Sequence, residues 1–444
     1  MSHAKQLHDR RYFDDYLEII NRHGLPGNVK HEVCQQVRDT VLITVQTVLE
    51  HALQEEGATY LGCARYTHLP VGRTPESTRS GSSQRALRTQ YGGIPALHVP
   101  KLRRGNGALP WQTIMRYERC WGPLLDQHIL GYCLGLSLRD LQEVMQVTLG
   151  EMMSLAACNR LVLTVQEQVR AFKTAALDAP PPIVLVDGMW VKIAYPTGEI
   201  TDDARGRHRQ AKRQQKRVVL TALGVWPDGH WEIVHWQIAS GETAETWKAF
   251  FGELYRKGIT EQTTALVVSD GSKGLESALD HHLYGVPHQR CIFHKIKQLA
   301  DHLVFHDLPL EATEPEDKAQ RKAKRHRKKA ILADASWVYD GDGEADIRAR
   351  AEVFCATWHT QEPEAVANFL IDFDKTLSYC EVYFPQSRVS LIRTTNLLER
   401  FHKEMRRKQR DIGMFQSAQG CDVLWYLLSM RETAKQRAAV RSRP

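Results

Sequence analysis

The spacing of apolar residues divides the chain into helical and β-rich stretches. Over residues 1 to about 60, apolar side chains recur every three or four positions, as in "HEVCQQVRDTVLITVQTVLEHAL", which predicts helices. Residues 111–178 are predicted to be helical as well. From residue 183 the chain turns to apolar runs rich in β-branched and aromatic residues. Three successive strands are predicted there, at "IVLVDGMWVKIAY", "RVVLTALGVW" and "HWEIVHWQIA".

The β-rich stretch continues with alternating helices and strands. A helix is predicted at "TAETWKAFFGELYRKG", a buried strand at "TALVVSD", a helix at "GLESALDHHL" and a short strand around "VPHQRC". Three antiparallel strands followed by alternating helix and strand are typical of an α/β protein with a mixed sheet. Residues 305–390 are predicted to be a helical insertion, and "TTNLLERFHKEMRRK" predicts a further helix.

Local composition predicts how these stretches are grouped. Residues 1–62 form an N-terminal helical region, and residues 63–110 form a basic linker with a short hairpin. Within that linker, "VGRTPESTRSGSSQRALRTQYGG" has the composition of a loop, and "IPALHVP" that of a short strand. Two core segments, 179–304 and 391–435, flank the insertion. Residues 436–444 are predicted to be a flexible basic tail.

The helical residues 111–178 contain a candidate helix-turn-helix, "GLSLRDLQEVMQVTLGEMMSLAACNRLVLTV". Ser137 can cap its first helix, with Asp140 at the spacing of a capping box, and Gly150 can supply the turn. A plain helical hairpin that packs on its own core has the same pattern. The sequence therefore leaves open whether this region reads DNA.

Composition and charge narrow the class of protein. Hydrophobic residues make up 42% of the 444 positions, as in globular proteins, and no apolar run approaches the roughly 20 residues that span a bilayer. With no apolar signal-peptide core near the N-terminus, we expect a cytoplasmic protein and no membrane partner. The nine cysteines include no CxxC pair, which favours reduced thiols over a zinc finger.

The net charge of +7 is modest, but the cations are clustered, which suits binding to a polyanion. One cluster, "RGRHRQAKRQQKR", lies between the first two strands and is predicted to be a hairpin loop that touches phosphates, or else a solvated loop. The other lies in "RTTNLLERFHKEMRRKQR". The predicted DNA-binding residues are Arg205, Arg207, Arg209, Lys212, Arg213, Lys216, Arg217, Arg400, Lys403, Arg406, Arg407 and Lys408.

Three carboxylates stand where a carboxylate is unexpected. Asp187 lies inside an apolar strand, where burial is costly unless something compensates the charge, although a hydrogen-bonded core Asp or a turn would also explain it. Asp270 ends a buried strand, an edge where functional groups gather, and could instead cap the next helix. Glu399 lies in a basic helix, where it could be an exposed ion-pair residue. Together the three would suit two Mg²⁺ ions roughly 4 Å apart.

The blocks "VVSDGSKGLESAL", "VPHQRCIFHKIKQL" and "TTNLLERFHKEMRRK", in this order and after "VDGMW", resemble the Mutator-like DDE transposases of bacterial insertion sequences. The resemblance covers about residues 85–430. It implies an α/β fold with a ribonuclease H-like catalytic core, a mixed five-stranded sheet with flanking helices. An all-helical insertion would interrupt this core, and a mainly helical DNA-binding region would precede it.

The resemblance also implies roles for individual residues. Asp187, Asp270 and Glu399 match the three catalytic positions, which would hold two ions of Mg²⁺ or Mn²⁺. Glu404 falls outside the family's "TTN..E" pattern and is expected on the helix surface.

Cys291 and His294 form the "CxxH" signature of the family. A zinc site would need about four ligands, and no matching second pair is evident. The pair is expected to support the active site or contact DNA, and simple packing in the core remains an alternative.

The function implied is that of a DNA transposase. It would bind the ends of an insertion sequence as a homodimer, in the nucleoid, cut the double-stranded DNA and join it to target DNA. No small-molecule substrate is expected. Two alternatives remain: an element-derived DNA-binding protein without catalysis, and a nuclease on the same fold that does not join strands.

Overall fold

The computed structural model describes residues 27–67, 77–103, 111–115, 118–149, 153–202, 206, 208–305 and 316–441. The chain forms two compact units. The first comprises Met1–Thr164, Pro196–Arg213 and Asp411–Gly413, and the second Val165–Tyr195, Gln214–Arg410 and Met414–Pro444. Within the described ranges, no helix is long and apolar enough to cross a membrane.

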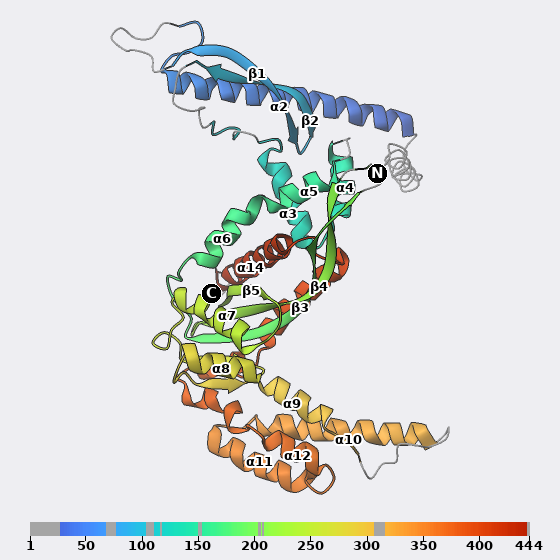
Figure 1. Ribbon diagram of the computed structural model, residues 1–444, viewed down its shortest axis with the longest axis vertical. Helices are drawn as coiled ribbons and strands as arrows, with labels where there is room; N and C mark the ends of the chain where they lie inside the picture. Colours follow the sequence, from blue (N-terminus) through green and yellow to red (C-terminus); the bar gives the residue numbers. More distant parts are fainter. Residues whose placement is uncertain are drawn as a thin grey trace. The chain divides into compact units, whose positions relative to one another are not determined.

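In the first unit a long helix packs on a two-stranded sheet. Helix α2 (Gly27–Leu61) packs on strand β2 (Gly92–Leu102), which pairs antiparallel with β1 (Arg79–Thr89) (Figure 1). Their shared core includes Leu53 and Leu97. The loop predicted over residues 71–93 is therefore wrong at β1, whose polar residues are tolerated because the backbone pairs with β2 and most of the strand is not buried.

Three shorter helices complete the first unit's described core: α3 (Gly122–Leu134), α4 (Leu138–Leu149) and α5 (Leu155–Val162). The predicted capping box at the start of α4 is confirmed. Ser137 Oγ accepts from the Asp140 N–H at 3.2 Å, and Asp140 Oδ2 accepts from the Ser137 N–H at 2.8 Å. The predicted turn residue Gly150 lies outside the described residues. DNA reading by α4 and α5 stays a prediction.

The second unit is built on a five-stranded mixed sheet, as the strand pattern predicted. In the order β5-β4-β3-β6-β7, β4 and β5 are antiparallel, whereas β6 is parallel to both β3 and β7. The strands are β3 (Ile183–Asp202), β4 (His208–Val225), β5 (Trp231–Ala239), β6 (Leu266–Ser269) and β7 (His288–Arg290).

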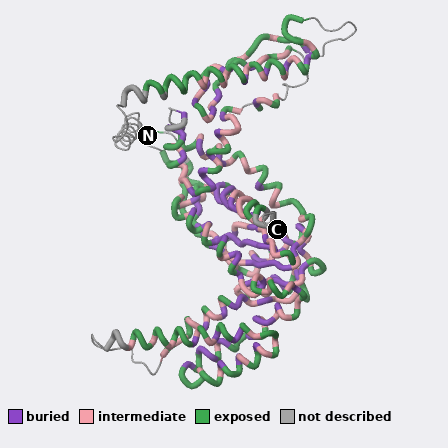
Figure 2. The backbone as a smooth tube through the Cα atoms, turned by 180° about the vertical axis from the view of Figure 1, so that it is seen from behind, coloured by how far each residue is buried: buried purple, intermediate pink, exposed green. Residues whose placement is uncertain are grey.

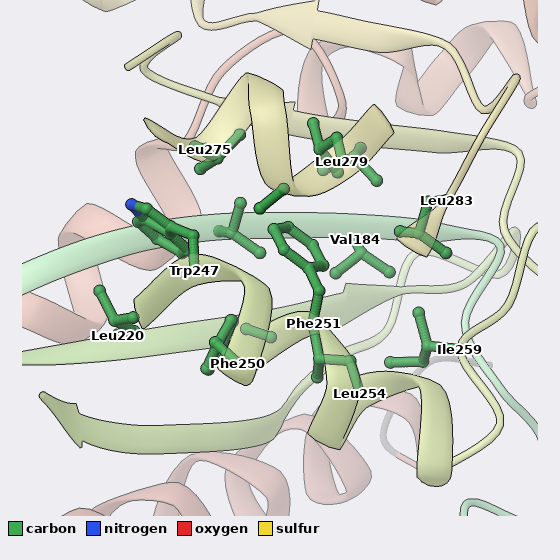
Figure 3. Packing of buried hydrophobic residues seen from close by; sticks show 14 of the residues in the cluster. Val184, Leu220, Trp247, Phe250, Phe251, Leu254, Ile259, Leu275, Leu279 and Leu283 are labelled. Carbon is green, nitrogen blue, oxygen red and sulfur yellow. The ribbon is translucent and has the colours of Figure 1, made fainter. Parts of the chain in front are cut away.

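Helices α7 (Ala244–Arg256) and α8 (Lys273–His282) cover one face of this sheet. Figure 3 shows Val184, Trp247 and Leu275 in the core between them. Figure 2 shows that buried residues are concentrated in the strands of this sheet. Side chains alternate between the two faces of a strand, so Val184 and Val186 point toward these helices, and Asp187 points to the opposite face.

The opposite face packs against α13 (Asn396–Ile412) and α14 (Ala418–Arg441). The Trp236 Nε1–H of β5 donates to Asp422 Oδ1 of α14 at 2.9 Å. Helix α14 continues through Arg441, so the flexible tail predicted from residue 436 is wrong for residues 436–441, and residues 442–444 lie outside the described part. The last two helices of the described chain thus cover the face of the sheet opposite α7 and α8.

Between the sheet and α13 the described chain is helical, as predicted. Helix α9 (Ile292–Asp301) is followed by α10 (Glu316–Val338), α11 (Glu344–Trp358) and α12 (Pro363–Leu370), and then by three short 3₁₀ helices within residues 374–391. Buried aromatic residues, including Phe369, hold these helices together. Residues 306–315 lie outside the described part.

The basic stretch between the first two strands is not the loop that its composition predicted. Residues 208–217 already belong to β4, because the strand pair extends well beyond the apolar positions of the sheet. Arg205 and Arg207 lie outside the described residues, and for Arg209 only the backbone is described. Lys212 and Arg213 belong to the first unit and Lys216 and Arg217 to the second.

Candidate active site

The side chain of Asp187, in strand β3, points to the face of the sheet that α13 covers. Its Oδ1 accepts from the Gly188 N–H at 2.8 Å, and its Oδ2 lies 3.3 Å from Nδ1 of His402. The side chain is 18% exposed, so the carboxylate is partly open to solvent although it lies in an apolar strand. Both oxygens thus have a polar neighbour, and the side chain as a whole keeps some access to solvent.

Asp270 lies directly after β6, at the carboxyl end of that strand. Its Oδ1 accepts from the Ser272 N–H at 3.2 Å, which shapes the turn into α8. Gly271 between them has φ 83°, a backbone conformation that favours glycine. Burial, followed by the charge of Asp187, raises the pKa of Asp270 above its ordinary value. Asp187 and Asp270 therefore repel one another electrostatically.

Glu399 lies in the first turn of α13, near Thr395 directly before that helix and His294 of α9. Its Oε1 is 3.5 Å from Oγ1 of Thr395 and 3.6 Å from Nε2 of His294. The hydrogen bond with Cys291, together with the charges of Asp187 and Glu399, raises the pKa of His294 to about 9, although burial opposes this rise. His294 is therefore linked electrostatically to all three predicted acids, because its charge also opposes the rise in the pKa of Asp270.

Cys291 and Thr395 link the start of α9 to the start of α13. The Thr395 N–H and Oγ1–H both point to the buried Sγ of Cys291 at 3.3 Å. Burial opposes ionisation of the Cys291 thiol, but its hydrogen bonds with His294 and Thr395 outweigh burial and lower the pKa. Since Thr395 also contacts Glu399, this pair braces the helix turn that carries the predicted acid.

Glu242, a fourth carboxylate that the sequence analysis did not single out, lies between β5 and α7. Its pKa is raised by burial and by the charges of Asp270 and Asp187. A Cβ atom at position 188 would lie 2.8 Å from Glu242 Oε1, so only glycine lets this carboxylate come so close to the backbone beside Asp187. The sequence "DG" at 187–188 indicated a candidate acid followed by a glycine, but no local sequence pattern links these residues to Glu242.

The predicted trio shares one electrostatic neighbourhood in the second unit. The charge of Asp187 acts on Asp270, Glu242 and His294, and that of Glu399 acts on His294 as well. With the side chains as they stand, no three His, Cys, Asp or Glu residues in the described part of the chain form a group that could hold a metal ion. The donor chemistry nevertheless fits a hard cation, because a bound ion would relieve the repulsion that Asp187 exerts on Asp270 and Glu242.

Comparison with known proteins identifies the family. Residues 27–309 and 317–437 match "Transposase, Mutator family". The chain belongs to this family.

Its relatives in the Mutator family include the "Transposase for insertion sequence element IS905" of Lactococcus lactis, 25% identical over 398 residues that make up 90% of each chain. The "Transposase for insertion sequence element IS256 in transposon Tn4001" of Staphylococcus aureus is 26% identical and covers 85% of this chain and 86% of its own. The solved "Drosophila P element transposase strand transfer complex" aligns with 71% of this chain and 80% of its own, at 12% identity and a TM-score of 0.27.

A basic cavity of about 320 Å³ lies beside α13 of this Mutator-family chain. Five cations and two acids surround buried aromatic rings. The lining residues are Trp231, Arg400, Phe401, Lys403, Glu404, Arg407, Arg410, Glu432 and Lys435. Three of the predicted DNA-binding residues, Arg400, Lys403 and Arg407, therefore share one surface in the second unit, and Arg406 on the same helix is also exposed.

Glu404 and Lys408, on the same helix, are engaged within the protein and are less open to solvent than the exposed cations. Glu404 accepts from Arg407 Nη2 at 2.8 Å, and this bond with Arg407 is the main reason why its pKa lies below the ordinary value. The Lys408 side chain is only 1% exposed, and its Nζ lies 3.7 Å from Glu404 Oε1. Glu404 thus pairs with cations of its own helix, and Lys408 faces the protein interior, where a phosphate cannot reach it without a rearrangement.

Proposed function

We propose that this chain is a DNA transposase that binds the ends of an insertion sequence, cleaves the DNA with divalent metal ions and joins it to target DNA. Family membership and relatives that match most of both chains support the transposase assignment. The observation that carries the catalytic part is the shared electrostatic neighbourhood of Asp187, Asp270 and Glu399, residues from three distant segments.

The sheet supports a ribonuclease H-like core. Its first three strands in the chain lie side by side, and the fourth and fifth continue the sheet in parallel beyond the first. This is the mixed five-stranded sheet that the family resemblance implies. In this proposed core, Asp187 on the first strand, Asp270 after the fourth and Glu399 on a helix after the insertion would contribute to one site in the second unit.

Asp187, Asp270 and Glu399 are the residues that would hold two Mg²⁺ or Mn²⁺ ions. Such ions activate a water or a sugar hydroxyl and stabilise the departing oxygen of a phosphodiester. The protein's part is to orient the ligands: the Gly188 N–H and His402 flank Asp187, and Thr395 holds the turn that carries Glu399. His294 lies beside Glu399 and neutralises part of the acidic charge. A bound metal ion would take over this role, and the contact between His294 and Glu399 would then break.

Double-stranded DNA is the proposed substrate, both as element ends and as target. The exposed cations of α13 and of β4 would contact phosphates, which orient DNA without reading its sequence. Among the side chains that the structure describes, we omit Lys408 because it is buried. The proposed phosphate contacts are Lys212, Arg213, Lys216, Arg217, Arg400, Lys403, Arg406 and Arg407. A homodimer is part of the proposal, because two ends must be brought together for joining.

The test is a paired assay that scores cleavage and strand joining separately on one DNA substrate with Mg²⁺. Asp187→Asn, Asp270→Asn and Glu399→Gln should each abolish both steps, a loss of roughly a thousandfold or more, while DNA binding persists. Glu404→Gln is the matched control on the same helix, because its amide oxygen can still accept from Arg407. It should behave like the parent protein.

Other outcomes would support the alternatives. Cleavage without joining by the parent protein would make the chain a nuclease on this fold. DNA binding with neither activity, unaffected by the three acid substitutions, would make it a DNA-binding protein without catalysis. Loss of both steps in Glu404→Gln with full activity in Glu399→Gln would show that the wrong acid of α13 was chosen.

A further inference from the structure

His402 is a buried histidine one helical turn after Glu399, and it has polar neighbours on both ring nitrogens. Its side chain is 0% exposed. Nδ1 lies 3.3 Å from Asp187 Oδ2, and Nε2 lies 3.3 Å from the Thr221 hydroxyl of β4. In the described residues Nδ1 has no hydrogen-bond partner of good geometry, so the Asp187 carboxylate is the polar group that faces it.

The chemistry of these neighbours assigns the hydrogens of the ring. A carboxylate only accepts, so Nδ1 must carry a hydrogen toward Asp187. The buried Thr221 hydroxyl can donate to Nε2 or accept from it, and it also lies 3.5 Å from the carbonyl of Val219. A hydrogen on Nδ1 therefore suits the Asp187 side of the ring, and the Thr221 hydroxyl suits Nε2 as donor or acceptor.

Packing fixes the plane of the ring. The ring centroids of His402 and the fully buried Trp425 are 6.3 Å apart in an edge-to-face arrangement. The backbone N–H of Gly188 holds the other oxygen of Asp187. Asp187 thus has the Gly188 N–H at one oxygen and the tightly packed His402 ring beside the other.

We propose that His402 is a positioning residue of the metal site, which orients Asp187 through Nδ1 and is itself oriented by Thr221. This inference rests on the proposed function, because Asp187 is a metal ligand only if the chain uses divalent ions. Partners that hold a ligand carboxylate in place raise the affinity for the metal without touching it. His402 therefore acts through Asp187 and need not contact DNA.

Two conservative variants separate the two ring nitrogens. In His402→Asn the amide nitrogen occupies about the position of Nδ1 and can donate to Asp187, whereas in His402→Gln the amide lies near the position of Nε2 and can reach Thr221. His402→Ala removes both contacts. The measurements, on the full-length chain, are Mn²⁺ binding by calorimetry, Mn²⁺-dependent DNA cleavage and the thermal midpoint without metal.

We expect His402→Ala to weaken Mn²⁺ binding by about 10- to 100-fold, the usual effect of removing a partner of a metal ligand. His402→Asn should recover most of this affinity and His402→Gln little of it, whatever their thermal midpoints. Equal Mn²⁺ affinity in the Asn and Gln variants would overturn the inference, even if the Ala variant does not fold. If the parent binds no Mn²⁺ and does not cleave, the proposed function fails instead.

Discussion

At the scale of single residues, the carboxylates of Asp187, Asp270 and Glu242 repel one another. Burial and the charge of Asp187 raise the pKa of Asp270, and burial and the charges of Asp270 and Asp187 raise that of Glu242. The folded protein therefore keeps these protons to higher pH than the unfolded chain does, whose values lie near 3.8 and 4.5. The free energy of unfolding therefore falls as the pH rises from the unfolded-state pKa values through the higher folded-state values. At a pH below the unfolded-state pKa values these two carboxyl groups cause no such loss.

Removing one charge should relieve this repulsion. We expect Asp270→Asn to raise the free energy of unfolding of the metal-free protein at pH 7 by about 1 kcal/mol, as for other unfavourable charges that are removed. Its Oδ1 can still accept from the Ser272 N–H. Thermal unfolding in EDTA and in Mg²⁺ provides the measurement. Mg²⁺ should stabilise the parent more than the variant, and equal stabilisation would argue against metal binding at Asp270.

At the scale of elements, α13 has a buried side and an exposed basic side. His402 and Met405 are buried in the second unit, whereas Arg400, Lys403 and Arg407 line the basic cavity. Lys408 lies on the buried side. The buried side of the helix therefore packs within the second unit, whereas the other side leaves these cations exposed to solvent.

Neutralising the exposed side should affect DNA affinity alone. Each of Arg400→Gln, Lys403→Gln and Arg407→Gln is expected to weaken binding to all DNA sequences and to reduce the salt dependence by roughly one phosphate contact. Lys408→Gln should instead lower stability and leave the salt slope unchanged. Titrations of fluorescent DNA at several salt concentrations measure both. A loss limited to the element's end sequence would make these residues base readers.

The start of α7 offers a second test at this scale, because its cap follows Glu242 directly. Thr243 Oγ1 accepts from the Thr246 N–H at 3.3 Å, and Thr246 Oγ1 accepts from the Thr243 N–H at 3.0 Å. Thr243→Ala should lower the free energy of unfolding by about 1 kcal/mol, and Thr243→Ser should change it little because the hydroxyl remains. Urea denaturation distinguishes these outcomes, and equal losses in both variants would show that the methyl group, not the cap, is responsible.

At the scale of the whole molecule, the proposal requires two chains for two DNA ends. Each end would then be processed by a chain with its own acids. Mixing equal amounts of parent and Asp187→Asn chains before assembly should reduce joining of both ends to about a quarter, the share of dimers with two parent chains in a random mixture. Counting doubly joined products measures this share. A reduction to only about three quarters, the share of dimers with at least one parent chain, would indicate that one active chain suffices.

The sequence alone determined the helices and strands of the second unit and the three acids. Apolar periodicity is a local property, so the strands around Asp187 and Asp270 and the helix that carries Glu399 were predicted where the structure has them. The ordered motifs then matched these acids to the family. Assignment of the acids to metal remains a prediction, because it concerns what they bind rather than where the chain folds.

Only the tertiary structure decided which distant residues meet. The strand Arg79–Thr89 and the first half of β4 look like loops by composition, because a polar strand is stabilised by backbone hydrogen bonds to a neighbour that local sequence does not reveal. Glu242 approaches Asp187 only because Gly188 leaves room, and His402 reaches it only because α13 packs on the sheet. Burial and electrostatic coupling depend on such contacts between segments far apart in the chain, and so they emerge only when the chain has folded.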